Sequence, residues 1–134
     1  MVSMQVQLRS IADTEAAVGW ADGHTVLVDR PDGRAGGAGL GFNGAQLLAL
    51  AAGGCFCNDL RYVAHEMRVA LGTVAVDINI ELAGEPLLAT AISMLVTCEM
   101  LDGSDPESVI DRARQSCMVT NSLPRGVPVE IGIR

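Results

Sequence analysis

The sequence contains no lysine, because all nine of its basic residues are arginines. This absence excludes enzymes that form a Schiff base through a lysine amine, and it excludes P-loop NTPases, whose phosphate-binding loop needs a lysine. Positive charge is scarce as well, since 16 acidic residues give the chain a net charge of −7 and a pI near 4.6. Nucleic acids and anionic membranes attract a basic face. We therefore expect neither as a partner.

Aromatic residues and long apolar runs are also scarce. Aromatic side chains make up 3% of the sequence, whereas hydrophobic residues make up 49%, so aliphatic side chains must form the core. The longest apolar stretch, residues 45–56, is too short to span a bilayer and contains two glycines. The 134 residues suit one domain, residues 1–134. So much apolar surface on so small a chain indicates a buried interface in a homodimer.

Several catalytic and targeting motifs are missing. The first residues show no charged start and no apolar segment of a signal peptide, so we expect a cytoplasmic location. The sequence has no dinucleotide-binding GxGxxG in the required context, no GxSxG elbow and no HExxH. We expect no cofactor and no metal. In the cytoplasm, the four cysteines should be reduced.

Periodicity predicts an α+β fold with a largely antiparallel sheet, a long central helix and a second helix. Asn43 and Gln46 have the spacing of a capping box at the start of the long helix. Gly53 and Gly54 lie inside that helix and cost about 1 kcal/mol each relative to alanine. We expect another backbone to pack closely over them. The predicted elements are strands at 4–9 and 24–29, a helix from 44, strands at 74–82 and 88–100, a helix from 104 and a strand at 127–133.

The cysteines are the most informative reactive residues. Cys55 lies on the apolar stripe of the long helix, and Cys57 lies about 200° further round it, so their side chains should diverge. A soft-metal or sensor site that uses both is an alternative hypothesis. Cys98 lies on the apolar face of a strand and reads as a core residue. Cys117 ends the stripe of the second helix, where it is either a core residue or a thiol partner.

The acidic residues show no spacing that singles out a general acid and base. Asp29, Asp59, Glu66 and Glu81 are candidate carboxylates. We expect most of the acidic side chains to be solvated.

Two cysteine motifs carry a resemblance to a known family. The stretch GFNGAQLLALAAGGCFCNDLRYVA resembles the central helix of the OsmC-like proteins, which include the organic hydroperoxide resistance proteins. In that family, a loop ending in Asn-Pro-Glu opens a long helix that leads to a Cys-Phe pair. The segment that begins at Cys117 is similar to the family's second motif, with Met118 in place of a proline. The upstream strand and Gly-rich loop, DGHTVLVDRPDGRAGG, also resemble this group.

The resemblance implies a fold, a partner and an activity. The implied fold is an intertwined homodimer with active sites at the subunit interface. The implied activity is a thiol-dependent peroxidase that reduces organic hydroperoxides and is regenerated by an external thiol. Carried over, Cys55 is the peroxidatic thiolate and Cys117 the resolving thiol. Arg30, with Arg34 as the other candidate, would lower the pKa of the Cys55 thiol.

The sequence departs from the family pattern at the start of the helix. The glutamate that orients the arginine in the family is replaced by Ala45. Gln46 can hydrogen-bond an arginine but carries no charge to pair with it. This departure favours, as an alternative function, a non-catalytic OsmC-like dimer that binds an apolar small molecule at its interface.

Overall fold

The computed structural model describes residues 1–134, which form two compact units, Met1–Leu48 (unit 1) and Ala49–Arg134 (unit 2). The elements are strands and helices in an α+β order, and both sheets are antiparallel. The predicted fold class is therefore confirmed. None of the helices has both the length and the apolar character needed to cross a bilayer.

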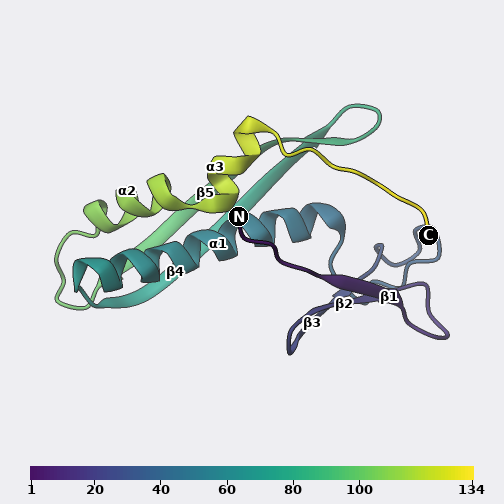
Figure 1. The fold of residues 1–134 in the computed structure, drawn as a ribbon, viewed down its shortest axis with the longest axis horizontal. Coiled ribbons are helices and arrows are strands. Elements are labelled where there is room, and N and C mark those ends of the chain that lie inside the picture. The colour runs from purple at the N-terminus through teal and green to yellow at the C-terminus, as the bar shows by residue number, and fades with distance from the viewer. The chain divides into compact units, whose positions relative to one another are not determined.

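Unit 1 is built on a three-stranded sheet of β1 (Gln7–Ser10), β2 (Ala17–Ala21) and β3 (His24–Val28), in that order (Figure 1). The sequence predicted strands around β1 and β3 but not the short β2. The Gly-rich loop after β3 returns to its end, because Phe42 N donates to Leu27 O at 2.9 Å. Gly41 is required there, since a Cβ atom would overlap the Leu27 backbone.

Helix α1 (Gly44–Met67) begins where the sequence predicts. Asn43 N donates to the side-chain oxygen of Gln46 at 3.0 Å, and Gln46 N donates to Asn43 Oδ1 at 2.9 Å. The two residues thus form the reciprocal capping box and satisfy two backbone donors that the first turn leaves free.

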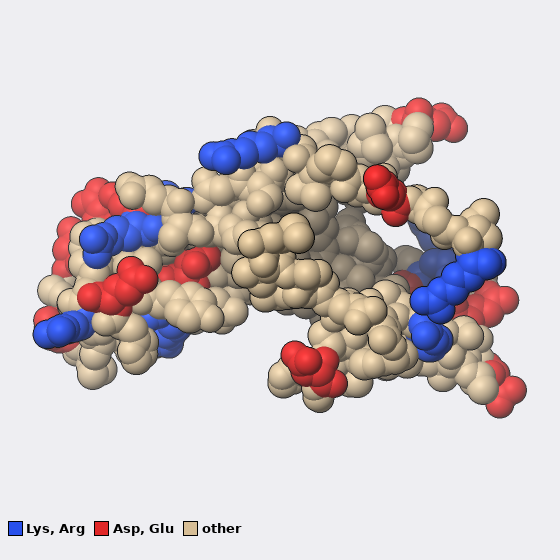
Figure 2. Space-filling model, viewed as in Figure 1, with Lys and Arg blue, Asp and Glu red and all other residues tan.

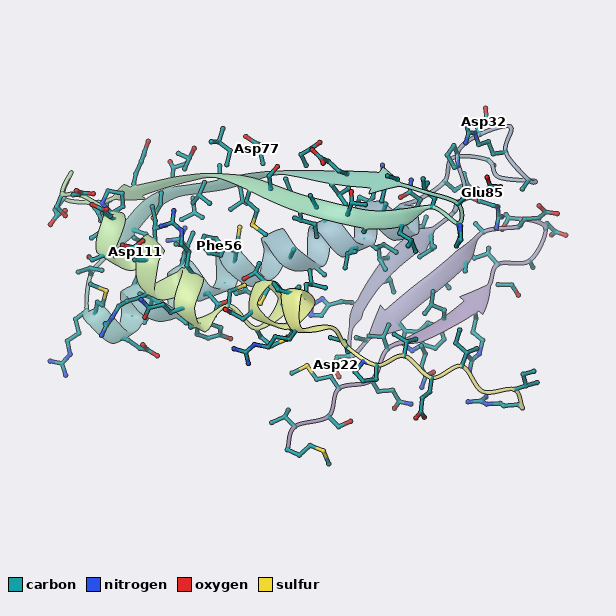
Figure 3. The ribbon with its side chains drawn as sticks, turned by 90° about the horizontal axis from the view of Figure 1, so that it is seen from above. Asp22, Asp32, Phe56, Asp77, Glu85 and Asp111 are labelled. Atoms are coloured by element: carbon teal, nitrogen blue, oxygen red, sulfur yellow. The ribbon has the colours of Figure 1, made fainter.

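The sheet of unit 2 is a long hairpin of β4 (Leu71–Ala83) and β5 (Leu88–Met100) (Figure 1). Its alternation matches the prediction, since Val76 and Ile78 are half-buried whereas Asp77 and Asn79 are exposed. Figure 3 shows Asp77 pointing away from α1 and Phe56 lying on the opposite, covered side of the hairpin. One face of the hairpin therefore packs against the hydrophobic core of unit 2.

Two helical segments complete the core of unit 2. Helix α2 (Glu107–Ser116) begins three residues later than predicted, with Pro106 at its N-cap, and α3 (Met118–Ser122) leads into a 3-10 turn, η1 (Leu123–Arg125). The sequence did not predict α3. Side chains from α1, β5 and the α2–α3 segment meet in one buried cluster. Its members are Phe56, Leu60, Val63, Cys98, Val109, Ala113 and Cys117.

Two local expectations differ from the structure. A Cβ atom on Gly53 would overlap the Ile78 side chain of β4, whereas nothing lies close to Gly54. The close neighbour of the helix is therefore a side chain rather than a backbone. The predicted strand at 127–133 is extended but pairs with nothing, and Val129 and Ile131 are 81% and 92% exposed. A strand needs a partner strand to satisfy its backbone, and none of the strands of this chain pairs with these residues.

Candidate active site

The centre of unit 2 brings together two sulfur atoms from distant parts of the sequence. Cys55 lies in the middle of α1, and Cys117 is the residue between α2 and α3. Their Sγ atoms lie within 4.8 Å of one another, and both cysteines are free thiols. Cys117 is completely buried, whereas Cys55 is half-buried. A disulfide bond is about 2.05 Å long, so the two sulfurs would have to approach by less than roughly 3 Å to form one.

A carboxylate lies beside the sulfur pair. Asp59 follows Cys55 by four residues, one turn further along the same face of α1. The Cys55 thiol donates to Asp59 Oδ2 at 3.5 Å, and a carboxylate oxygen of Asp59 lies within 4.8 Å of both sulfurs. The sequence predicts that most acidic residues are solvated, and Asp59 was one candidate carboxylate among four. Its spacing of four from Cys55 on one helix is the pattern that would have identified it.

The surroundings of Cys55 favour the thiol over the thiolate. Burial raises the pKa of the Cys55 thiol, and the neighbouring Cys117 and Asp59 raise it further. The backbone N–H of Val119 in α3 donates a hydrogen bond to this sulfur and acts in the opposite direction. A peroxidatic cysteine needs the opposite shift. Within unit 2, then, the chain surrounds Cys55 with negative or apolar groups and one backbone donor.

The other two cysteines take no part in this cluster. Cys98 is 8% exposed and packs in the core of unit 2, as the sequence predicts, and burial raises the pKa of its thiol. Cys57 is half-buried and is absent from the groups that affect Cys55.

Unit 1 holds Arg30, the arginine that the sequence analysis selected. Arg30 Nη2 lies 3.3 Å from Asp29 Oδ1 and also donates to the carbonyl oxygen of Glu15. Its Nε is buried and has no hydrogen-bond partner. The carboxylate that pairs with Arg30 belongs to the adjacent residue in the sequence, Asp29.

The negative charge of Asp29 is stabilised by several backbone hydrogen-bond donors. Its side chain is buried. Its carboxylate oxygens accept hydrogen bonds from the backbone nitrogens of Arg30, Ala38 and Leu40, at N···O distances of 2.8 to 3.0 Å. The Leu40 N–H is the strongest of the influences that hold the pKa of Asp29 below its ordinary value of 3.8. The expectation of a solvated carboxylate is therefore wrong for Asp29. Arg34, the alternative arginine, is exposed and forms no ion pair.

A shallow hollow of about 400 Å³ opens on the surface of unit 2 next to Asp59. Asp59, Glu66 and Arg112 place charges of both signs in its wall, and Ser116 brings it next to Cys117. On the face in Figure 2, acidic and basic side chains also alternate over the end of unit 2 that carries α2, without a basic stripe. The wall also includes Tyr62 and Val63, so it combines charged and apolar side chains.

Comparison with known sequences decides the family. The sequence profile described as OsmC-like protein matches residues 36–132, which is most of the chain. The chain belongs to the OsmC-like protein family. No curated protein sequence matches this OsmC-like protein closely enough to count as a relative.

Solved structures agree with this assignment at the level of the fold. The OsmC-like protein has 12% sequence identity to an OsmC-like protein of unknown function from Vibrio cholerae, with a TM-score of 0.74, covering 90% of this chain and 93% of the other. An OsmC-like protein from Mycoplasma pneumoniae is 15% identical, with a TM-score of 0.75 and coverage of 92% and 88%. An organic hydroperoxide resistance protein from Legionella pneumophila is 18% identical, with a TM-score of 0.62 and coverage of 90% and 88%.

Proposed function

We propose that this OsmC-like protein is a thiol-dependent peroxidase that reduces organic hydroperoxides with Cys55 and Cys117. The observation that carries the proposal is the approach of the two Sγ atoms to within 4.8 Å. Some structural neighbours are named organic hydroperoxide resistance proteins, which agrees with this substrate class.

The proposed cycle balances without any cofactor. The Cys55 thiolate attacks one peroxide oxygen, the O–O bond breaks, and the alcohol leaves with a proton while Cys55 becomes a sulfenic acid. The Cys117 thiol then attacks the Cys55 sulfur, releases water and forms a disulfide. An external thiol reduces that disulfide by exchange. Cys117 is completely buried, so it meets the oxidised Cys55 sooner than it meets a solvent oxidant.

The cycle needs a positive charge at Cys55, because burial and negative neighbours raise the pKa of its thiol. We propose that Arg30 supplies it and that Asp29 replaces the family's glutamate as the group that orients Arg30. Two observations support this role: the ion pair between Arg30 and Asp29, and the buried Arg30 Nε that lacks a partner. A guanidinium beside a thiolate lowers the pKa of the thiol and orients the peroxide.

The decisive experiment measures consumption of cumene hydroperoxide and t-butyl hydroperoxide with dithiothreitol as reductant. Cys55→Ser should abolish turnover. In a single turnover without dithiothreitol, Cys117→Ser should consume about one equivalent of peroxide and accumulate sulfenic acid, because the resolving thiol is gone. Cys57→Ser is the matched control on the same helix and should retain full activity. Full activity of Cys55→Ser would reject the proposal.

We further propose that residues 1–134 form one OsmC-like domain and work as a homodimer in the cytoplasm. Coverage of about 90% of the chain by neighbours supports one domain. The unpaired segment 127–133 supports a partner, because its alternating apolar residues are 61–100% exposed and need a strand to pair with. Removal of residues 127–134 should shift the protein from dimer to monomer in light scattering. A full-length monomer would contradict the homodimer.

A further inference from the structure

The three groups at the centre of unit 2 have the chemistry of a metal site. Two thiols and one carboxylate converge, and their Sγ and carboxylate oxygen atoms all lie within 4.8 Å of one another. They come from different elements, since Cys55 and Asp59 lie on α1 and Cys117 joins α2 to α3. Thiolates select soft or borderline cations such as Zn²⁺, which also accepts a carboxylate ligand.

The spacing agrees with one tetrahedral ion. With Zn–S bonds of about 2.3 Å and Zn–O bonds of about 2.1 Å, neighbouring ligand atoms are roughly 3.5–3.8 Å apart. The observed distance of 3.5 Å between Cys55 Sγ and Asp59 Oδ2 already has this value. The other two separations, which are at most 4.8 Å, need to close by roughly 1 Å at the most to reach it.

The charges also favour a cation. Two thiolates and a carboxylate whose ligand atoms lie within 4.8 Å of one another would repel each other with no cation between them. No arginine or histidine forms an ion pair with Asp59. A divalent ion bound between the three groups removes this mutual repulsion, because a coordinated thiol is held as the thiolate.

The hollow beside Asp59 provides a route for the ion. It has a volume of about 400 Å³, and its wall includes Asp59 and Ser116, the neighbour of Cys117. Asp59 is half-buried, whereas Cys117 is completely buried. Three protein ligands and access for water are the features of a zinc site with an open fourth position.

We propose that reduced Cys55, Asp59 and Cys117 bind one thiophilic divalent cation, with zinc as its reference ion and with the fourth position open to solvent. This site differs from the Cys55–Cys57 site considered from the sequence, because Asp59 and Cys117 replace Cys57. The proposed site also differs from the sequence-based expectation that the protein binds no metal. Binding does not depend on the proposed peroxidase activity.

Oxidation would release the ion, and this coupling rests on the proposed function. One hydroperoxide and two protons convert the two metal-bound thiolates into a disulfide, with one alcohol, one water and the free ion as products. The two sulfurs lose two electrons, and the peroxide O–O bond gains them. Since a disulfide supplies no thiolate, only Asp59 remains as a ligand.

The test is a titration of the fully reduced protein with zinc alone, against a chromophoric chelator and without oxygen. We expect one equivalent of zinc, no binding in Cys55→Ser or Cys117→Ser, and a loss of affinity of at least roughly tenfold in Asp59→Asn. Cys57→Ser and Asp77→Asn are matched controls on α1 and β4 and should bind as the parent protein does. Equal binding by the Asp59→Asn, Cys57→Ser and parent proteins would overturn the site.

A second measurement guards against misfolded variants, because Cys117 is completely buried. Cobalt substituted for zinc should show a thiolate charge-transfer band that falls by about half when either cysteine is replaced in a variant with unchanged circular dichroism. An unchanged band would overturn the site. Addition of t-butyl hydroperoxide to the zinc-loaded protein should release the zinc. Binding without release would leave the metal site in place and count against the peroxidase, whereas peroxidase activity without zinc binding would reject the site alone.

Discussion

The pKa values of Asp29 in unit 1 and Cys55 in unit 2 are shifted in opposite directions by their surroundings. Asp29 is buried, yet backbone N–H groups from Leu40, Ala38 and Arg30 hold its pKa below the ordinary value. Cys55 is half-buried beside Asp59 and Cys117, and its pKa is raised. Burial acts in the same direction on both groups. The backbone donors therefore outweigh burial at Asp29, whereas the single donor at Cys55 does not, and this difference sets the direction of each pKa shift.

This contrast separates a structural anion from a reactive one. The Asp29 carboxylate finds its hydrogen-bond donors within its own loop and forms an ion pair with Arg30. The Cys55 thiolate is incomplete within unit 2 and needs a cation from elsewhere, either the proposed Arg30 or the proposed metal ion. The ionisation of Cys55 should therefore depend on whether one of these cations is present.

The largest expected effect comes from breaking the Asp29 site. Asp29→Asn keeps the size of the side chain but turns one acceptor into a donor that faces backbone N–H groups. We expect the loss of Arg30 positioning to lower the peroxidase kcat/KM by up to roughly a hundredfold, as a misplaced catalytic group does. Asp32→Asn in the same loop is the control. Unchanged kinetics in Asp29→Asn would remove Asp29 and Arg30 from the reaction.

The same comparison predicts the response of unit 1 to acid. A carboxyl group whose folded pKa is depressed contributes stability that is complete above its unfolded pKa and is lost as the pH falls through its folded pKa. For Asp29, whose ordinary value is 3.8, the loop should stay ordered down to that pH and open only below it. The amide protons of Ala38 and Leu40 should then lose protection from exchange in NMR spectra. Loss of protection already near pH 5 would contradict the depressed pKa.

A smaller effect, on the reactivity of Cys55, is expected when its negative neighbour Asp59 is removed. Asp59→Asn removes one negative neighbour, so the pKa of Cys55 should fall and its thiolate fraction at neutral pH should rise. In metal-free protein, the rate of Cys55 alkylation by iodoacetamide should increase a few-fold and reach its plateau at a lower pH. Glu66→Gln in the wall of the same hollow is the control. A slower reaction in Asp59→Asn would show that Asp59 acts instead as a proton acceptor.

The sequence predicts the local parts of this structure and misses those that depend on distant chain. The capping box at Asn43 and the alternation of β4 and β5 follow from neighbours within a few residues. The meeting of Cys55 and Cys117 came from a family resemblance, because periodicity alone left Cys117 as either core or thiol partner. The role of Asp29 depends on where the amides of Ala38 and Leu40 arrive, and no residue pattern encodes the path of that loop.

The smallest effect, on stability, should come from an exposed ion pair on α2, which lies outside both the Asp29 and the Cys55 sites. Arg114 donates to Asp111 on α2, and their side chains are 67% and 48% exposed. Water screens such a pair and both side chains lose entropy, so Arg114→Ala should change the free energy of unfolding by only about 0.5 kcal/mol. Urea denaturation measures this change. A loss of several kcal/mol would contradict this expectation and would mean that the exposed charges hold α2 over the core.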